Sequence, residues 1–254
     1  MALSEKTFAE QHIIVTGGGT GIGRAAALAF AAQGAASVTI TGRRPEPLDE
    51  VAALHSAVIP LVADVATEAG TEAIAAAVQA RGDKLDVLVH NAGVFGTTPL
   101  DDLDPADLRH QFEVNVFGPI LLTAKLLPYL RSPGSNIVVV SSISARLANP
   151  AQSVYGASKA AIDSFIRSAA VELGPKGIRV NGVAPGNVQT PILATGGVSP
   201  EDIDEWRTGY ADKAPAGRIG QVSDVTPWIT RLAEPTSSWI TGEIIVVDGG
   251  MLIA

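Results

Sequence analysis

Short, uninterrupted runs of apolar and β-branched residues recur along the chain and constrain its fold more than any other feature. Three of them read Ile-Ile-Val-Thr from residue 13, Val-Leu-Val-His from residue 87 and Ile-Val-Val-Val-Ser from residue 137. A strand with one face in water alternates apolar and polar residues, whereas a run that is apolar throughout is typical of a strand covered on both faces. The predicted strands are residues 12–16, 37–41, 58–63, 86–90, 136–141, 179–183 and 243–247.

Alanine-rich segments with helical character separate these runs, at residues 21–33, 68–81, 105–130 and 152–173. Strands that alternate with helices form right-handed βαβ units and a parallel sheet. We therefore predict an α/β fold, a doubly wound (Rossmann) three-layer sandwich with a parallel sheet of about seven strands. No segment reads as a linker, so residues 1–254 are expected to form a single domain.

Composition narrows the classes of function. Lys and Arg number 18 and Asp and Glu 26, so the net charge of −8 argues against a nucleic-acid partner. The absence of cysteine excludes disulfides and thiolate nucleophiles, and the spacing of the four histidines predicts no metal site. Residues 1–10 hold no apolar run of signal-peptide length, and no stretch of about twenty apolar residues predicts a membrane span. A cytoplasmic protein is the expectation.

One segment, residues 190–220, breaks the alternation of strands and helices. It is rich in glycine and proline and holds a short helical piece at residues 201–212. Insertions of this kind often fold over a site, so we predict a substrate-binding loop or lid.

A glycine cluster follows the first predicted strand directly and opens the first long helix. Residues 16–23 read Thr-Gly-Gly-Gly-Thr-Gly-Ile-Gly, which fits G-x-x-x-G-x-G with Gly17, Gly21 and Gly23. Glycines let the backbone approach a pyrophosphate, and the helix N-terminus favours its charge. This turn predicts a dinucleotide site.

The end of the second strand indicates which dinucleotide binds. It reads Thr41-Gly42-Arg43-Arg44, and the first acid is Glu46. A carboxylate at this place would bind the ribose 2′-hydroxyl of NAD, whereas guanidinium groups pair with the 2′-phosphate of NADP. NADP(H) is therefore favoured over NAD(H), with Arg43 as the expected main contact.

A candidate for proton transfer lies at the start of the last long helix. Tyr155 and Lys159 are four residues apart and share a helix face. An ammonium group beside a phenol lowers the phenol's pKa towards working pH, so Tyr155 is expected to be a general acid or base.

Taken together, the motifs resemble those of a short-chain dehydrogenase/reductase over nearly the whole chain. Ser142 precedes Tyr155 by the spacing that this family uses, and His90 and Gly182 are small departures from the family pattern, where Asn and a larger residue are usual. The matching pieces are Thr16–Gly23, Asp64-Val65, His90-Asn91-Ala92-Gly93, Asn115, Ser141-Ser142, Tyr155-Gly-Ala-Ser-Lys159, Asn181 and Pro185-Gly186.

The resemblance implies roles for single residues. Tyr155 would be the acid/base, Lys159 would hold the nicotinamide ribose and lower the Tyr155 pKa, Ser142 would bind the substrate oxygen, and Asn115 would help hold a water in the proton relay. The implied cofactor-binding residues are Gly17, Thr20, Gly21, Ile22, Gly23, Arg43, Arg44, Asp64, Val65, Asn91, Gly93, Tyr155, Lys159, Pro185, Gly186, Val188 and Thr190.

Candidates for the substrate pocket are mostly apolar, which predicts a medium-sized, largely apolar ketone or secondary alcohol. They are Phe95, Ser144, Leu147, Asn149, Val154, Ile192, Trp206 and Tyr210. A β-ketoacyl reductase acting on carrier-bound thioesters is an alternative, for which Arg131, Arg146 and Arg167 would face the carrier. Two further alternatives are an NAD-linked alcohol dehydrogenase and a catalytically silent dinucleotide-binding scaffold.

Assembly is expected as well. The helices at residues 105–130 and 152–173 carry apolar residues on more than one side, which suggests a partner. The resemblance implies that these helices pair in a four-helix interface, and that the last strand supplies a second one. A homotetramer, or else a homodimer, is predicted.

Overall fold

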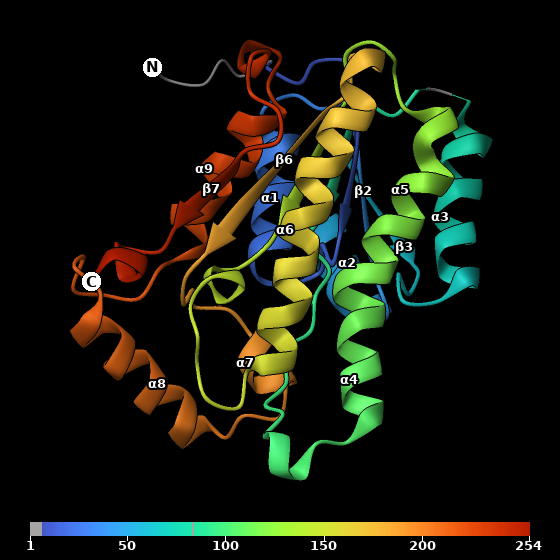
Figure 1. Ribbon diagram of the computed structural model, residues 1–254. Coiled ribbons are helices and arrows are strands. Elements are labelled where there is room, and N and C mark those ends of the chain that lie inside the picture. The colour runs from blue at the N-terminus through green and yellow to red at the C-terminus, as the bar shows by residue number, and fades with distance from the viewer. Residues whose placement is uncertain (1–6, 83) are drawn as a thin grey trace.

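The strands form a single parallel sheet, in the order β3-β2-β1-β4-β5-β6-β7. The computed structural model describes residues 7–82 and 84–254 (Figure 1). The bounds of the strands are β1 His12–Thr16, β2 Ser37–Gly42, β3 Val58–Val62, β4 Val87–His90, β5 Asn136–Val140, β6 Arg179–Pro185 and β7 Ile244–Val247. The predicted doubly wound α/β sheet is confirmed, and the predicted strand bounds differ from these by at most two residues.

The chain builds the sheet outwards from β1 in two directions. It runs from β1 through β2 to β3, then returns to place β4 on the other side of β1, with Ile13 opposite Val87. Strands β5 to β7 continue from there. In an open parallel sheet, the point where the strand order reverses leaves a crevice at the carboxyl ends of the strands. That point lies between β1 and β4.

Two layers of helices cover the sheet (Figure 1). One layer holds α3 (Glu68–Arg81), α4 (Pro105–Phe112), α5 (Gly118–Leu126) and α6 (Ser153–Leu173). The other holds α1 (Gly21–Ala32), α2 (Pro45–Ala52) and α9 (Val222–Ala233). Helices α7 (Ile192–Thr195) and α8 (Pro200–Lys213) lie at the edge of the sheet instead, at the lower end of the view.

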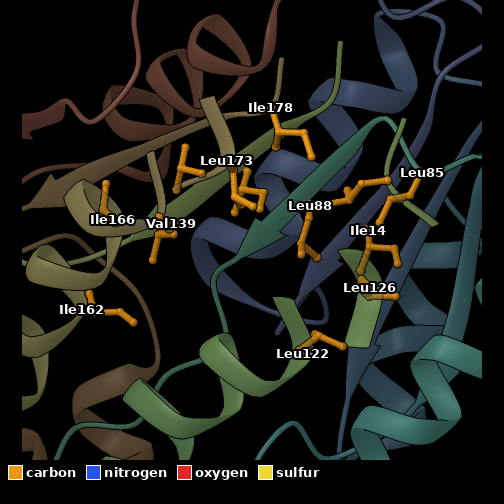
Figure 2. Close-up of a cluster of buried hydrophobic side chains, with 14 of the residues drawn as sticks. Ile14, Leu85, Leu88, Leu122, Leu126, Val139, Ile162, Ile166, Leu173 and Ile178 are labelled. Atoms are coloured by element: carbon orange, nitrogen blue, oxygen red, sulfur yellow. The ribbon is translucent and has the colours of Figure 1, made fainter. Parts of the chain in front are cut away.

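The core between the sheet and the first layer is aliphatic (Figure 2). Leu122 and Leu126 of α5 and Ile162 and Ile166 of α6 belong to one buried cluster with strand side chains such as Leu88. Burial of such side chains stabilises the fold by about 1.5–3 kcal/mol each. A second cluster joins α1, α2 and α9 to the opposite face. The apolar strands predicted from the sequence are thus covered on both sides.

The helices differ from the prediction in four places, one of which is the short α7, which is not predicted. The long helix predicted at residues 105–130 is divided into α4, a π-helical turn at Glu113–Phe117, and α5. Pro119 follows this turn and has no N–H to donate to the Asn115 carbonyl four residues back, and the Gly118 N–H donates five residues back, to Glu113. Helices α2 and α9 are absent from the predicted set. The short helix predicted at residues 201–212 is α8.

Two expectations concern the ends and the environment of the chain. The expectation for residues 1–10 falls partly on residues 1–6, which lie outside the described residues. Across residues 7–82 and 84–254, we find no helix with the length and apolar character needed to span a membrane.

Candidate active site

A cleft of about 1160 Å³ lies along the carboxyl edge of the sheet, where the strand order reverses. The turn after each strand from β1 to β6 contributes to its wall. These contributions include Gly17 and Thr20 after β1, Arg43 after β2, Asp64 after β3, Asn91 after β4, Ser142 after β5 and Gly186 after β6. The parallel arrangement brings together residues that lie far apart in the sequence.

The glycine turn forms one end of the cleft. Gly17 and Gly21 have φ angles of 65° and 54°, a region that side-chain-bearing residues rarely adopt. A Cβ atom on Gly17 would lie 2.8 Å from the Cα of Ala92, so the turn also requires glycine for space. Thr20 begins α1 without a side-chain capping bond, which leaves the first amides of the helix to an anion.

Asn91 holds this turn in place. Its Nδ2 donates to the carbonyl oxygens of Thr16, at 3.0 Å, and of Gly17, at 3.1 Å. The backbone N–H groups of Asn91 and Ala92 donate to the Thr16 hydroxyl. Gly23 packs behind the turn, since a Cβ there would lie 2.3 Å from the Asn91 amide.

All the other cofactor candidates line the cleft. They are Gly17, Thr20, Gly21, Ile22, Arg43, Arg44, Asp64, Val65, Asn91, Gly93, Tyr155, Lys159, Pro185, Gly186, Val188 and Thr190. Arg43 and Arg44 are exposed at its rim, directly before α2. Within residues 7–82 and 84–254, no three His, Asp or Glu side chains lie together in a way that could hold a metal ion.

Tyr155 and Lys159 lie at the start of α6, and both are buried. The Lys159 ammonium is 5.7 Å from the centre of the Tyr155 ring and donates to the Val140 carbonyl oxygen at 3.1 Å. Ser142 follows β5, and its hydroxyl accepts a hydrogen bond from the Ser144 N–H at 3.1 Å. The three predicted side chains therefore face the same part of the cleft.

The predicted lowering of the Tyr155 pKa is not what the structure shows. Burial raises the pKa of Tyr155 to about 12, because a buried phenolate loses its hydration, and the Ser142 hydroxyl offsets this only in part. Burial also lowers the pKa of Lys159 to about 8, opposed by the charge of Asp163. Tyr155 is thus a neutral phenol in this state and suited to donate a proton.

Asn115 lies in the π-helical turn and is buried. Its Oδ1 accepts from the Val94 N–H and its Nδ2 donates to the Val94 carbonyl, each at 2.9 Å. Nδ2 also donates to the Ser158 hydroxyl at 3.1 Å. Asn115 thus joins the loop after β4 to α6. Its implied role in holding a water stays a prediction.

An aromatic wall stands opposite the glycine turn. The ring of Phe95 makes edge-on contacts with Tyr155, at 5.1 Å between centroids, and with Trp206 of α8, at 5.9 Å. The Tyr210 hydroxyl donates to the Asp248 carbonyl oxygen at 2.5 Å and so ties α8 to the segment after β7. The other predicted substrate residues that line the cleft are Ser144, Leu147, Asn149 and Ile192.

Val154 lies elsewhere. It lines a separate apolar hollow of about 600 Å³ with Leu108 and Phe112 of α4, because its side chain leaves α6 on another face than Tyr155 does. Helix α4 instead supplies cleft residues that the sequence analysis missed, namely Asp107, His110 and Gln111. Gln111 is 3% exposed, and its Oε1 has no partner among the described residues. No motif marks these positions, so only the fold reveals them.

The chain is similar to known proteins over nearly its whole length. The profile of a family described as "Enoyl-(Acyl carrier protein) reductase" matches residues 17–252. A 7alpha-hydroxysteroid dehydrogenase of Escherichia coli is 34% identical over 242 residues, which is 93% of this chain and 92% of that one. A cis-4-hydroxycyclohexanecarboxylate dehydrogenase of Sinomonas cyclohexanicum is 38% identical over 251 residues, 96% of this chain and 98% of that one.

A solved structure has the same fold. It is a short-chain dehydrogenase/reductase of unknown function from Caenorhabditis elegans, described with cofactor, at 35% identity. The match covers 96% of each chain with a TM-score of 0.89.

Proposed function

The chain belongs to the short-chain dehydrogenase/reductase family and is an oxidoreductase. We propose that it transfers hydride between NADP(H) and a medium-sized, largely apolar ketone or secondary alcohol. The observation that carries this proposal is Tyr155, a buried neutral phenol between Ser142 and the aromatic ring of Phe95. A carbonyl placed there would meet the phenolic proton donor beside the buried ring of Phe95.

The chain's own residues supply proton transfer and placement. Tyr155 gives its phenolic proton to the carbonyl oxygen during reduction and takes it back during oxidation. Ser142 donates a hydrogen bond to the same oxygen as negative charge develops there. The Lys159 ammonium lies under the Tyr155 ring, where its charge stabilises the phenolate left behind. Asn115 holds the loop after β4 against α6, the helix that carries Tyr155 and Lys159.

The glycine turn and the guanidinium groups fit a phosphorylated dinucleotide. The uncapped amides at the start of α1 would hold the pyrophosphate, and Arg43 and Arg44 would hold the 2′-phosphate. The bound nicotinamide would supply or accept the hydride. Lys159 would hold its ribose hydroxyls, and Asp64, Val65, Asn91, Gly93, Val188 and Thr190 would line its path through the cleft.

The substrate end of the cleft supports a ring-shaped, apolar substrate. Phe95, Trp206 and Leu147 offer apolar surface beside Tyr155. The two named relatives are, by their names, dehydrogenases of a hydroxysteroid and of a hydroxycyclohexanecarboxylate, both cyclic compounds with a secondary hydroxyl group. We extend that substrate character to this chain, with residues 190–220 as the segment that closes over the substrate.

A carrier-bound thioester is the weaker candidate, although the matching profile is described by a carrier-linked activity. A carrier protein is acidic and would need free basic groups. Arg131 pairs with Asp86, and Arg146 lies 3.8 Å from Asp163. Of the three expected docking residues, this leaves Arg167 without an ion pair among the described residues.

A panel of cyclic and linear ketones, assayed with NADPH for the wild type and for Tyr155→Phe, tests the proposal. We expect turnover of apolar cyclic ketones by the wild type and a loss of nearly all turnover in Tyr155→Phe, with NADPH binding retained. Tyr129→Phe is the matched control, because Tyr129 lies outside the cleft. Substantial turnover by Tyr155→Phe would refute the mechanism, and activity confined to charged sugars would refute the substrate class.

We also propose that the chain assembles as a homotetramer. Phe117 is 51% and Leu121 54% exposed along the π-helical turn and α5, Val171 on α6 is 79% exposed, and Trp239 is 98% exposed. Apolar side chains exposed to this degree on several elements favour interfaces with other copies.

A further inference from the structure

Asp163 is a buried carboxylate that the proposed proton transfer does not use. It lies on α6 one turn beyond Lys159 and two turns beyond Tyr155, and it is 5% exposed. Burial of a charged group is costly unless partners compensate for it. A carboxylate at this place therefore calls for an explanation in terms of what surrounds it.

Both carboxylate oxygens have partners beside the site. The Ser141 hydroxyl donates to Oδ1 at 2.5 Å, and a guanidinium nitrogen of Arg146 lies 3.8 Å from Oδ2. Ser141 directly precedes Ser142 and is held in the sheet by its N–H, which donates to the Val183 carbonyl at 2.8 Å. Asp163 therefore anchors the strand end that carries Ser142 to the helix that carries Tyr155.

Lys159 makes a second connection between the same two elements, because its ammonium donates to the Val140 carbonyl. Among the described residues, the charged and titratable groups that act on this ammonium are Tyr155 and Asp163 on its own helix, and Arg146, on the segment after β5, lies 3.8 Å from Asp163. Burial lowers the pKa of Lys159, and the negative charge of Asp163 raises it and so offsets part of that effect.

We infer that Asp163 is a positioning residue for the reaction. Its carboxylate fixes the end of β5 with Ser142 against α6, and its negative charge lies one helix turn from the Lys159 ammonium, which faces Tyr155. This inference rests on the proposed function, since it assigns Asp163 a task in that same proton transfer. Asp163 does not line the cleft and would act through Ser141 and Lys159.

The pH profile of kcat/KM for ketone reduction, measured with NADPH, tests the inference. In the wild type we expect kcat/KM to fall above about pH 8, as Lys159 loses its proton. We call this fall at high pH the alkaline limb of the profile. Asp163→Asn keeps the shape of the side chain but removes its charge, so the alkaline limb should move to lower pH by about one unit. Ser141→Ala keeps the charge, so it should lower kcat without moving the limb.

Arg146→Met gives a change of opposite sign. Arg146 is a cation 3.8 Å from the Asp163 carboxylate, so its removal should move the fall in kcat/KM to higher pH, a direction that loss of structure would not produce. Its side chain is 43% exposed, which favours a folded variant even where Asp163→Asn does not fold. Glu172→Gln, an exposed acid on the same helix, is the matched control and should leave the profile unchanged.

The results separate this inference from the proposed function. If Tyr155→Phe is inactive and the limbs of Asp163→Asn and Arg146→Met coincide with that of the wild type, the role of Asp163 is refuted and the function stands. The inference is also refuted if Ser141→Ala and Asp163→Asn shift the limb equally, because the charge would then not matter. If Tyr155→Phe retains turnover, the function itself fails.

Discussion

Two guanidinium groups, on Arg43 and Arg44, stand at the rim of the cleft where β2 ends. A phosphate there would accept charged hydrogen bonds, each contributing about 1.5–3 kcal/mol. Arg43→Ala should therefore lower the ratio of kcat/KM with NADPH to that with NADH by about ten- to hundredfold. Steady-state kinetics with both cofactors measures this ratio.

The matched control for this substitution is Arg167→Ala, which removes an exposed guanidinium from α6 outside the cleft. It should leave the cofactor ratio unchanged. If the wild type has equal kcat/KM with NADH and NADPH, or if Arg43→Ala leaves the ratio unchanged, the assignment of the 2′-phosphate to this rim is contradicted.

At the scale of residues, the sequence predicts side chains that belong to spaced motifs. Tyr155 and Lys159 are predicted this way, because they are one helix turn apart, whereas Ser142 is predicted from the spacing that the resembled family uses. Gln111 and Asp163 are not, since their neighbours come from other parts of the chain. The pKa of Tyr155 is likewise beyond the sequence, because burial decides it.

Single elements are connected by buried polar contacts, and His90 makes one of them. Its ring Nε2 lies 2.8 Å from the Thr123 hydroxyl, which joins β4 to α5. Burial lowers the pKa of His90 to about 3, so the folded protein keeps this ring neutral while the unfolded chain protonates it below about pH 6.5. The unfolded state then binds more protons, and stability falls as the pH falls from 6.5 towards 3.

His90→Gln should reduce this acid sensitivity, because glutamine reaches Thr123 without titrating. The wild type loses about 1.4 kcal/mol for each pH unit well below 6.5. We therefore expect the drop in free energy of unfolding between pH 7 and pH 5 to be smaller in His90→Gln by about 2 kcal/mol. Urea unfolding at both pH values measures the drop. The control is His110→Gln, a change at an exposed histidine, which should lose as much free energy of unfolding as the wild type between pH 7 and pH 5. If His90→Gln loses as much as His110→Gln, the role of His90 is contradicted.

Strands are predicted better than helices here, for physical reasons. A buried parallel strand is apolar throughout, so the pattern is visible in the sequence. Helix α9 carries Pro227 in its interior, a residue that usually ends a helix, and α2 holds only eight residues with two prolines at its start. The π-helical turn comes directly before Gly118-Pro119, where Pro119 lacks an N–H, and apolar periodicity does not record this change.

At the scale of the whole molecule, the proposed tetramer makes its own prediction. Light scattering of the wild type should give the mass of four chains. Phe117→Asp should reduce that mass, because it places a charge among the exposed apolar groups of the π-helical turn and α5. Leu54→Asp, a change at a 56% exposed leucine after α2, is the control and should remain tetrameric. A monomeric wild type would contradict the proposal.

The order of the strands has a consequence for how the chain acquires its fold. The pair β1–β4 is the centre of the sheet, yet its contacts join distant positions: the His12 N–H donates to the Asp86 carboxylate across 74 positions. Such pairing requires the closure of a long loop, which is slow. The cleft lies at this junction, so it exists only after the two halves of the chain have docked. A dinucleotide that binds the docked halves and not the separate ones therefore favours the native state by mass action, and cofactor supply during synthesis would raise the yield of folded chains.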